Sequence, residues 1–198
     1  MSHGQEQGHG LVEGENKRIA ILISVLALLL AIAETFGKSA QTHALSFNVE
    51  ASNLWAFYQA KTIRKTTLET AAEQMEVDVQ LAKDAIVKDL LAKRVKDWKD
   101  RAARYESEPK PDNKGEGRKE LMARALRAEA KRDHAMATYH NFEFASAAFQ
   151  IAIVLASSYL ITGVIYLLWG AGGLGMIGLL FSLLGIAAPN ALAFLGGP

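Results

Sequence analysis

The chain contains no cysteine in its 198 residues. This absence excludes disulfide bonds, thiolate nucleophiles, and zinc or iron–sulfur sites built on cysteine ligands. The chain also lacks an excess of charge of either sign, because its formal net charge at pH 7 is only +1. Nucleic-acid-binding proteins, in contrast, usually have a strongly basic face. The sequence has no glycine-rich phosphate loop, nucleophile elbow, HExxH motif or paired-carboxylate pattern. We therefore expect a protein that is not an enzyme, uses no cofactor or metal, and binds no nucleic acid.

Charge is missing altogether from Phe144 to the C-terminus, where no Asp, Glu, Lys, Arg or His occurs. An uncharged run of this length is typical of two membrane crossings. We predict transmembrane helices over residues 145–169 and 174–195, joined by a tight turn at the sequence WGAGG. Pro189 is expected to kink or end the last of these helices.

An earlier apolar run, residues 19–36, predicts a first transmembrane helix that spans roughly 27 Å. The polar, glycine-containing residues 1–18 before it are expected to form a disordered tail. The apolar run has the length of a span and is followed by a poor signal-peptidase site, so we expect it to be retained. Basic residues lie near both ends of the predicted spans, which leaves both orientations in the membrane open.

Glycine and proline are missing between Gly37 and Pro109, and helix-forming residues abound there. We predict an extramembrane helical arm over residues 37–144, whose turn near residues 107–117 is marked by the sequence EPKPDNKGEG. Mostly apolar residues in 4-3 spacing predict a coiled-coil-like seam along both sides of the arm. They are Leu68, Ala72, Met75, Val79, Ala82 and Ile86 on the ascending side, and Leu121, Ala125, Ala128, Arg132, Ala135, Tyr139 and Phe142 on the descending side. The spacing slips after Ile86 and resumes at Leu91, as a stutter would produce.

The two sides of this arm differ in predicted length, about 100 Å for the ascending helix and about 40 Å for the descending one. Either residues 42–64 turn aside, or the longer helix pairs with neighbouring subunits. The aromatic and basic residues of this stretch would suit a helix on the membrane surface. The alternative is that its aromatic residues fill the base of the arm. The expected fold is thus an all-α membrane protein with three transmembrane helices and an antiparallel, coiled-coil-like helical hairpin outside the membrane.

The segment EASNLWAFYQAKTIR at residues 50–64, with QIAI at residues 150–153, resembles the signature of an uncharacterised bacterial membrane family, domain of unknown function 4337. The resemblance implies an integral membrane protein with the same order of span, motif, charged helical region and two further spans. It supplies no reaction, substrate or cofactor. The motif is a candidate interface or binding site, and a structural network where the arm meets the membrane is the alternative. Its candidate residues are Glu50, Asn53, Trp55, Phe57, Tyr58, Gln59 and Lys61.

Other candidate residues lie in the predicted spans. Small residues let helices approach closely, and those expected to pack between chains are Ala148, Ala152, Ala156, Gly178 and Ser182. Polar residues at membrane depth either line a pore or bond to neighbouring helices, and they are Glu34, Ser146, Gln150 and Ser157.

The histidines do not predict a metal site. His3 and His9 lie in the tail, which offers no preorganised geometry, and His134 and His140 fall on different helix faces.

These observations lead to three functional hypotheses. The first is a self-associating scaffold in the bacterial inner membrane, crossing the lipid bilayer several times and forming a homo-oligomer. The second is a subunit of an oligomeric channel or transporter-like pore. The third is an accessory subunit of a larger membrane complex, with the aromatic motif contacting the partner.

Overall fold

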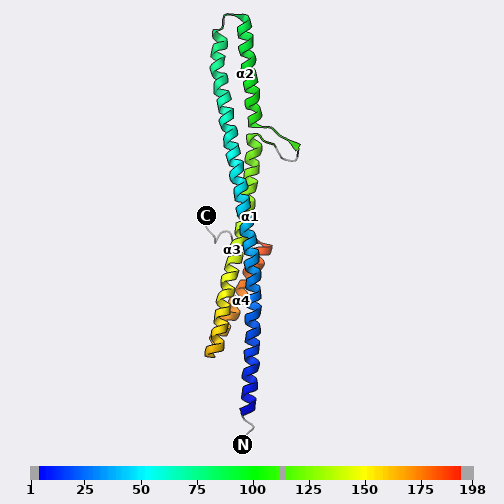
Figure 1. The fold of residues 1–198 in the computed structure, drawn as a ribbon, viewed down its shortest axis with the longest axis vertical. Helices are drawn as coiled ribbons and strands as arrows, with labels where there is room; N and C mark the ends of the chain where they lie inside the picture. Colours follow the sequence, from blue (N-terminus) through cyan, green and yellow to red (C-terminus); the bar gives the residue numbers. More distant parts are fainter. Residues whose placement is uncertain (1–4, 112–114, 193–198) are drawn as a thin grey trace. The chain divides into compact units, whose positions relative to one another are not determined.

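Every element in the described part of the chain is a helix (Figure 1). The computed structural model describes residues 5–111 and 115–192, and the side chains of residues 5–15 and 192 lie outside that description. In chain order the helices are α1 (Gln5–Leu81), α2 (Ala85–Glu106), α3 (Arg118–Thr162), α4 (Ile165–Ala187) and the short 3₁₀ helix η2 (Pro189–Leu192). Three of them, α1, α3 and α4, are long and apolar enough to cross a membrane.

The chain divides into two units. Unit 1 comprises residues 1–44 and 133–198, and unit 2 comprises residues 45–132. Helices α1 and α3 contribute residues to both units. The predicted spans fall in unit 1, whereas the charged central part of the sequence falls in unit 2.

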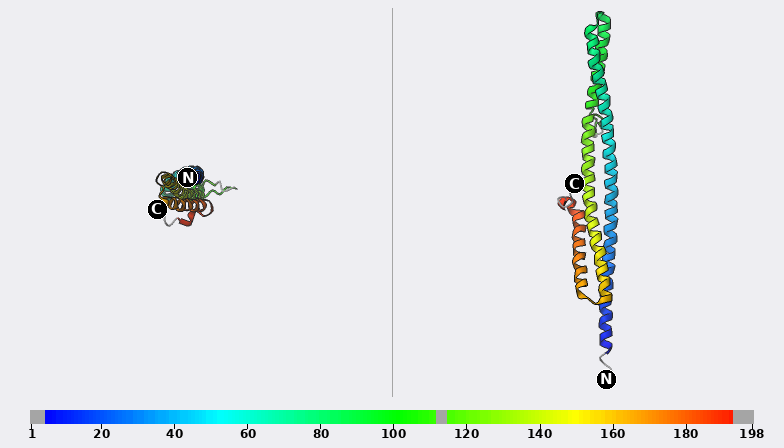
Figure 2. Two further views of the ribbon diagram at one scale, coloured as in Figure 1. Left: turned by 90° about the horizontal axis from the view of Figure 1, so that it is seen from below. Right: turned by 90° about the vertical axis from the view of Figure 1, so that its left-hand side faces the viewer.

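In unit 1, α1, α3 and α4 pack around a core in which large and small side chains alternate. Its buried residues are Leu26, Ala33, Phe142, Ala145, Phe149 and Ala152. The rings of Phe36 and Phe142 stack with centroids 5.7 Å apart. Helix α4 runs back along α3, as Figure 2 shows.

The turn between α3 and α4 lies at Gly163 and Val164, so the predicted turn at WGAGG was wrong. Gly163 has φ of +69°, a left-handed conformation that favours glycine, and its N–H donates a 2.8 Å hydrogen bond to the carbonyl of Tyr159. The glycines of WGAGG lie inside α4 instead. An apolar surrounding favours helix even for glycine-rich sequence, because every backbone polar group must be paired within the chain.

The boundaries of the spans change accordingly. Helix α3 ends at Thr162 rather than at residue 169, and α4 covers Ile165–Ala187 rather than residues 174–195, of which 193–195 lie outside the described residues. The prediction that Pro189 ends the last helix is confirmed, because α4 stops at Ala187 and Pro189 begins η2.

The first helix also begins earlier than expected. It starts at Gln5, so the part of the predicted disordered tail that the structure describes, residues 5–18, is helical; residues 1–4 lie outside the described part. Once a helix is nucleated in the apolar run, adding further turns is inexpensive, even through a sequence of modest propensity.

In unit 2 the chain reverses at residues 82–84, not at residues 107–117 as predicted (Figures 1 and 2). Asp84 is the N-cap of α2, because its Oδ1 accepts hydrogen bonds from the backbone N–H of Ile86 at 2.7 Å and of Val87 at 3.2 Å. Helix α2 then runs antiparallel to α1, with Lys99 Nζ 2.5 Å from Glu76 Oε1. The phase slip after residue 86 therefore reflects a helix end and a new helix, not a stutter.

Residues 107–117 join α2 to α3, and both of these helices pack on α1 within unit 2. The reversal at residues 82–84 accounts for the length mismatch that the sequence presented, because the returning side is two helices rather than one. Residues 42–64 do not turn aside, since α1 continues through them. Two of their aromatic residues, Trp55 and Tyr58, pack against the buried cluster of unit 2, as the alternative interpretation stated, whereas Phe57 is exposed.

Candidate functional site

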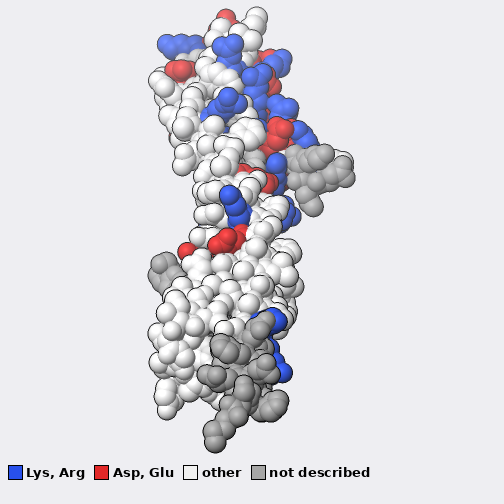
Figure 3. Space-filling model, turned by 60° about the horizontal axis from the view of Figure 1, so that its bottom comes forward, with Lys and Arg blue, Asp and Glu red and all other residues white. Residues whose placement is uncertain are grey.

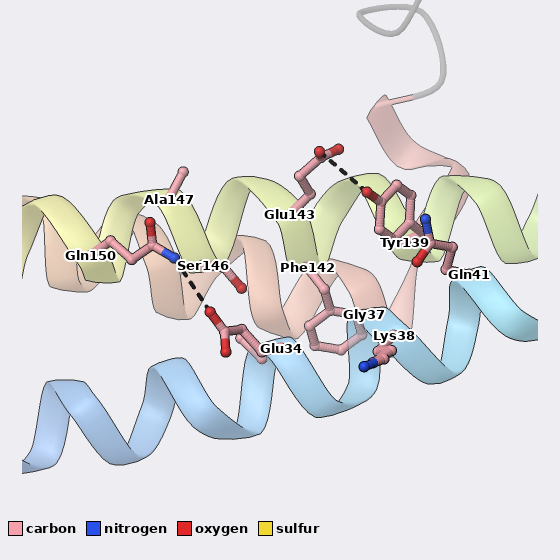
Figure 4. Close-up of a pocket in the computed structure, with 11 residues that line it drawn as sticks. Glu34, Gly37, Lys38, Gln41, Tyr139, Phe142, Glu143, Ser146, Ala147 and Gln150 are labelled. Carbon is pink, nitrogen blue, oxygen red and sulfur yellow. Dashed lines mark hydrogen bonds between the residues drawn. The ribbon is translucent and has the colours of Figure 1, made fainter.

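A polar groove lies on the surface of unit 1 between α1 and α3 (Figure 4). It is a hollow of about 460 Å³, and at one end of it Gln150 Nε2 donates a 3.3 Å hydrogen bond to Glu34 Oε1. Both side chains are exposed. The groove is also lined by Lys38, Gln41, Tyr139, Glu143 and Ser146, with Ala33, Gly37, Phe142 and Ala147 as its apolar part.

The position of the Glu34–Gln150 pair along the apolar part of α1 and α3 follows from their sequences. Glu34 precedes Lys38 by one helical turn, about 6 Å. Gln150 lies well inside the uncharged run that begins at Phe144. The pair is thus nearer the middle of the apolar helices than Glu143, which accepts a 3.3 Å hydrogen bond from Tyr139 and lies 3.3 Å from His140.

Three of the four predicted polar residues meet here. Glu34, Ser146 and Gln150 line one groove, although α1 and α3 are far apart in the sequence. Ser157 does not join them, because its hydroxyl donates to the backbone carbonyl of Ile153 at 2.8 Å. Two carboxylates, an ammonium group and two amides in one hollow can bond to a polar side chain of another helix, to water or to a small ion.

The small residues predicted to pack between chains are covered within the chain instead. Ala152 and Ala156 have no exposed surface, and Ala148 is 7% exposed. Gly178 of α4 is buried against the ring of Phe149, and Ser182 donates a 2.9 Å hydrogen bond to the Gly178 carbonyl. These residues bring the helices of unit 1 close together, so they do not offer a free face to a second copy.

The aromatic motif lies in unit 2, and one face of it is built into the helix packing. Trp55 Nε1 donates a 2.8 Å hydrogen bond to Glu129 Oε1 of α3, and the Trp55 and Tyr58 rings meet edge to face at 5.5 Å. Both pack against the buried cluster Ala51, Leu54, Leu121, Ala125 and Ala128. The buried positions on α3 confirm the 4-3 seam predicted for that helix.

Lys61 is the buried basic residue of the motif, with 7% of its surface exposed. Its ammonium lies 5.3 Å from the centroid of the Phe57 ring and 5.1 Å from that of Tyr105. Such cation–π contacts contribute roughly 0.5–2 kcal/mol, with the larger value for desolvated pairs. The other predicted motif residues point outward: Glu50, Asn53 and Gln59 are exposed, and Phe57 is 38% exposed.

Arg118, at the start of α3, joins three helices and was not among the predicted site residues. Its guanidinium donates to Glu106 Oε2 at 2.7 Å, to the Tyr58 hydroxyl at 2.8 Å and to Thr62 Oγ1 at 2.9 Å, and it lies over the Tyr58 ring. Although burial alone would raise the pKa of Glu106, the charges of Arg118 and Lys65 hold it below its ordinary value. The sequence offers no local signal for this cluster, because its members lie in three separate helices.

The start of the segment 107–117 is bonded to Glu120, in the first turn of α3. The Ser107 hydroxyl donates to Glu120 Oε1 at 2.6 Å, and the Glu108 N–H donates to Glu120 Oε2 at 3.2 Å. The bond from Ser107 is the main reason that the pKa of Glu120 lies below its usual value.

Among the described residues, no group of three or more His, Asp or Glu side chains could hold a metal ion. His3 and the side chain of His9 lie outside the described residues. His140 contacts Glu143 on its own helix, and the His134 carbonyl accepts a hydrogen bond from Thr138.

Comparison with known proteins places the chain in a family. Its residues 15–188 match the model of the family described as Domain of unknown function (DUF4337), which confirms the resemblance noted at the aromatic motif. No curated protein and no solved structure matches the chain. With the match covering most of its length, this all-helical chain belongs to the DUF4337 family.

Proposed function

We propose that the protein is a multi-pass membrane protein of the bacterial inner membrane that self-associates and serves as a structural scaffold, without catalysing a reaction. In this proposal α1, α3 and α4 cross the bilayer through unit 1, and unit 2 forms a helical arm in water. Three helices long and apolar enough to span a membrane support the first part. The ion pairs and exposed charges of unit 2 support the second.

The observation that carries self-association is the exposed Glu34 carboxylate on an apolar helix. An ionisable group at membrane depth is costly and is normally shielded from lipid by protein or water. In one chain it has a hydrogen bond from Gln150, yet both side chains remain exposed. A second copy that covers the groove would shield them and supply further polar contacts.

The test is the mass of the protein in lipid nanodiscs by native mass spectrometry. We expect an oligomer for the wild type, retention of most of it in Glu34→Gln, which keeps an amide in the groove, and a shift to monomer in Glu34→Leu. The matched control is Ile32→Leu, an exposed apolar position on the same helix, which should leave the mass unchanged. A monomeric wild type would overturn the proposal.

A second function, a subunit of an ion-conducting pore, is favoured by one arrangement. Glu34, Gln150 and Ser146 share one open hollow, so a ring of copies with this groove toward its axis would have a polar path for cations. Proteoliposomes with the wild type should then pass K⁺ faster than empty vesicles, and Glu34→Gln should reduce the flux. Equal flux in protein-free and protein-containing vesicles would rule this function out.

A further inference from the structure

Helix α1 has two opposite faces in unit 2 that both follow a 4-3 spacing. The inner face packs on α2 and α3 and includes Ala51, Leu54, Tyr58, Lys61, Lys65, Leu68, Ala72, Met75 and Val79, all buried or half-buried. A residue two positions further along a helix is rotated by about 200°, which places it on the opposite face. The positions two residues after these inner ones therefore form a second line along the outside of α1.

We call this line the outer stripe. It comprises these nine positions and Val49, which continues the same spacing before them: Val49, Asn53, Ala56, Ala60, Ile63, Thr67, Thr70, Gln74, Val77 and Leu81. All are exposed except the half-buried Ala60, and the exposed fractions of Ile63 and Leu81 reach 67% and 72%. None is charged, although the same stretch of α1 carries eight charged residues on its other faces.

Exposure to water alone does not account for this composition, because α2 offers a direct comparison. The equivalent outward positions along the second half of α2 are Lys93, Asp97, Asp100 and Arg104, and every one is charged. Figure 3 shows the charged side chains of unit 2 gathered toward one side, with uncharged surface beside them. The chain thus places charge on the outward face of the second half of α2 and keeps it off the outward face of α1, whereas the first half of α2 exposes Ile86 and Leu90.

We propose that the outer stripe is the surface through which the arms of two copies of this chain associate, as a parallel, in-register coiled coil. The inference rests on the self-association proposed above and adds to it a second contact surface, in unit 2. The stripe keeps its spacing for more than four heptads, long enough for a coiled-coil seam. The partner is a second copy in parallel, because in every copy tethered to one membrane α1 leaves the bilayer in the same chain direction.

The residue types along the stripe suit such a pairing. Val49, Ala56, Ile63, Thr70 and Val77 occupy one set of seam positions, and Asn53, Ala60, Thr67, Gln74 and Leu81 occupy the other. In a parallel, in-register pair, Asn53 meets Asn53 and Gln74 meets Gln74, which lets each amide bond to its copy and fixes the register. Between them the stripe carries the small side chains of Ala56, Ala60, Thr67 and Thr70, which let two helices approach closely there.

The charges beside the stripe give the proposal a distinctive consequence. In a parallel pair, a residue just before one seam position faces the residue five places further along the partner helix. Glu73 would therefore face Asp78 of the second copy, a like-charge contact that weakens the pair. Glu73→Lys replaces this repulsion with attraction and is expected to strengthen association, although Glu73 is exposed in the single chain.

The experiment uses the absence of cysteine, since each introduced cysteine is the only one in the chain. Ile63→Cys and Thr70→Cys place a thiol on the stripe, one heptad apart, and Ala103→Cys places one on the exposed, charged side of α2 as the matched control. The full-length proteins are oxidised in membranes and resolved by non-reducing electrophoresis. We expect disulfide-linked dimers from both stripe variants and none above background from the control.

The results distinguish failure of the stripe contact from failure of the proposed self-association. If native mass spectrometry shows an oligomer but neither stripe variant forms a dimer, the stripe is not the contact, and self-association stands through another surface. If only one of the two stripe variants links, the pairing is not parallel and in register. A monomeric wild type overturns both proposals. Thr70→Arg should reduce the dimer fraction of Ile63→Cys at least fivefold, and Glu73→Lys should raise it; the reverse order would contradict the parallel arrangement.

Discussion

Gly178 of α4 lies directly against the ring of Phe149 on α3. A Cβ atom added at Gly178 would lie 2.6 Å from Phe149 Cε1, closer than real Cβ contacts allow. The ring is fully buried, so it has little space into which to move. Close packing of α4 on α3 therefore requires glycine, which has no side chain, at residue 178.

Gly178→Ala should destabilise unit 1 by about 1–3 kcal/mol, the usual cost of overpacking a filled core. Thermal unfolding in detergent, followed by circular dichroism, measures the effect. Gly172→Ala is the matched control, because nothing lies within 4 Å of its added Cβ and alanine is the better helix former. A Gly178→Ala variant as stable as Gly172→Ala would show that α4 is not seated on Phe149.

Gly163→Val should also lower stability, by at least about 1–2 kcal/mol, because φ of +69° is strained for a residue with a Cβ atom. The loss here is conformational, since the added Cβ meets no atom within 4 Å. Gly163→Asn should cost less, because asparagine tolerates the left-handed region better. The unfolding free energies of the two variants in detergent should therefore rank valine as the more destabilising, and equal values would place the α3–α4 turn elsewhere.

Asp84→Ala tests where the chain reverses in unit 2. Loss of the N-cap bonds to Ile86 and Val87 should cost about 0.5–2 kcal/mol. It should also speed hydrogen exchange at those two amides. Asp89→Ala removes only an exposed pair with Lys93, which solvent screens, and serves as the control. Unchanged exchange at Ile86 and Val87 in Asp84→Ala would contradict the cap.

Acid should destabilise unit 2 through Glu106 and Glu120. Both carboxyl groups have a pKa below the ordinary value of 4.5 in the folded chain. Their contribution to stability is therefore complete above about pH 4.5 and is lost as the pH falls through the lower folded values. Melting temperatures measured from pH 6 to pH 3 should fall less steeply for Glu106→Gln and Glu120→Gln than for the wild type, and an equally steep fall in both variants would contradict this role.

Sequence reasoning found the elements of this fold more reliably than the places where the chain turns. Uncharged runs identified the helices apolar enough to cross a membrane, and the 4-3 spacing identified Leu121, Ala125 and Ala128 as buried. Both reversals were misplaced for one reason. The segments richest in glycine and proline were taken as the turns, whereas the chain reverses at a single capping aspartate, Asp84, and at a single glycine, Gly163.

The candidate sites were predictable only in part, because a side chain's partner depends on register between distant helices. The sequence identified Ser146 and Gln150 by their spacing along α3, and Glu34 by its place in the apolar run. That they line one groove depends on the register between α1 and α3. The contacts of Arg118 depend in the same way on where α2 ends relative to α1. The sequence therefore identifies unusual polar residues, whereas their contacts depend on how the helices pack.

The position of Arg118 has a consequence for how unit 2 comes apart. A single guanidinium holds the end of α2 through Glu106 and holds α1 through Tyr58 and Thr62, while it belongs itself to α3. Separating α2 or α3 from α1 therefore disturbs the hydrogen bonds of the same guanidinium. Unfolding of this region under heat or pulling force should accordingly be cooperative, with α2 and α3 released in one event instead of peeling away in succession.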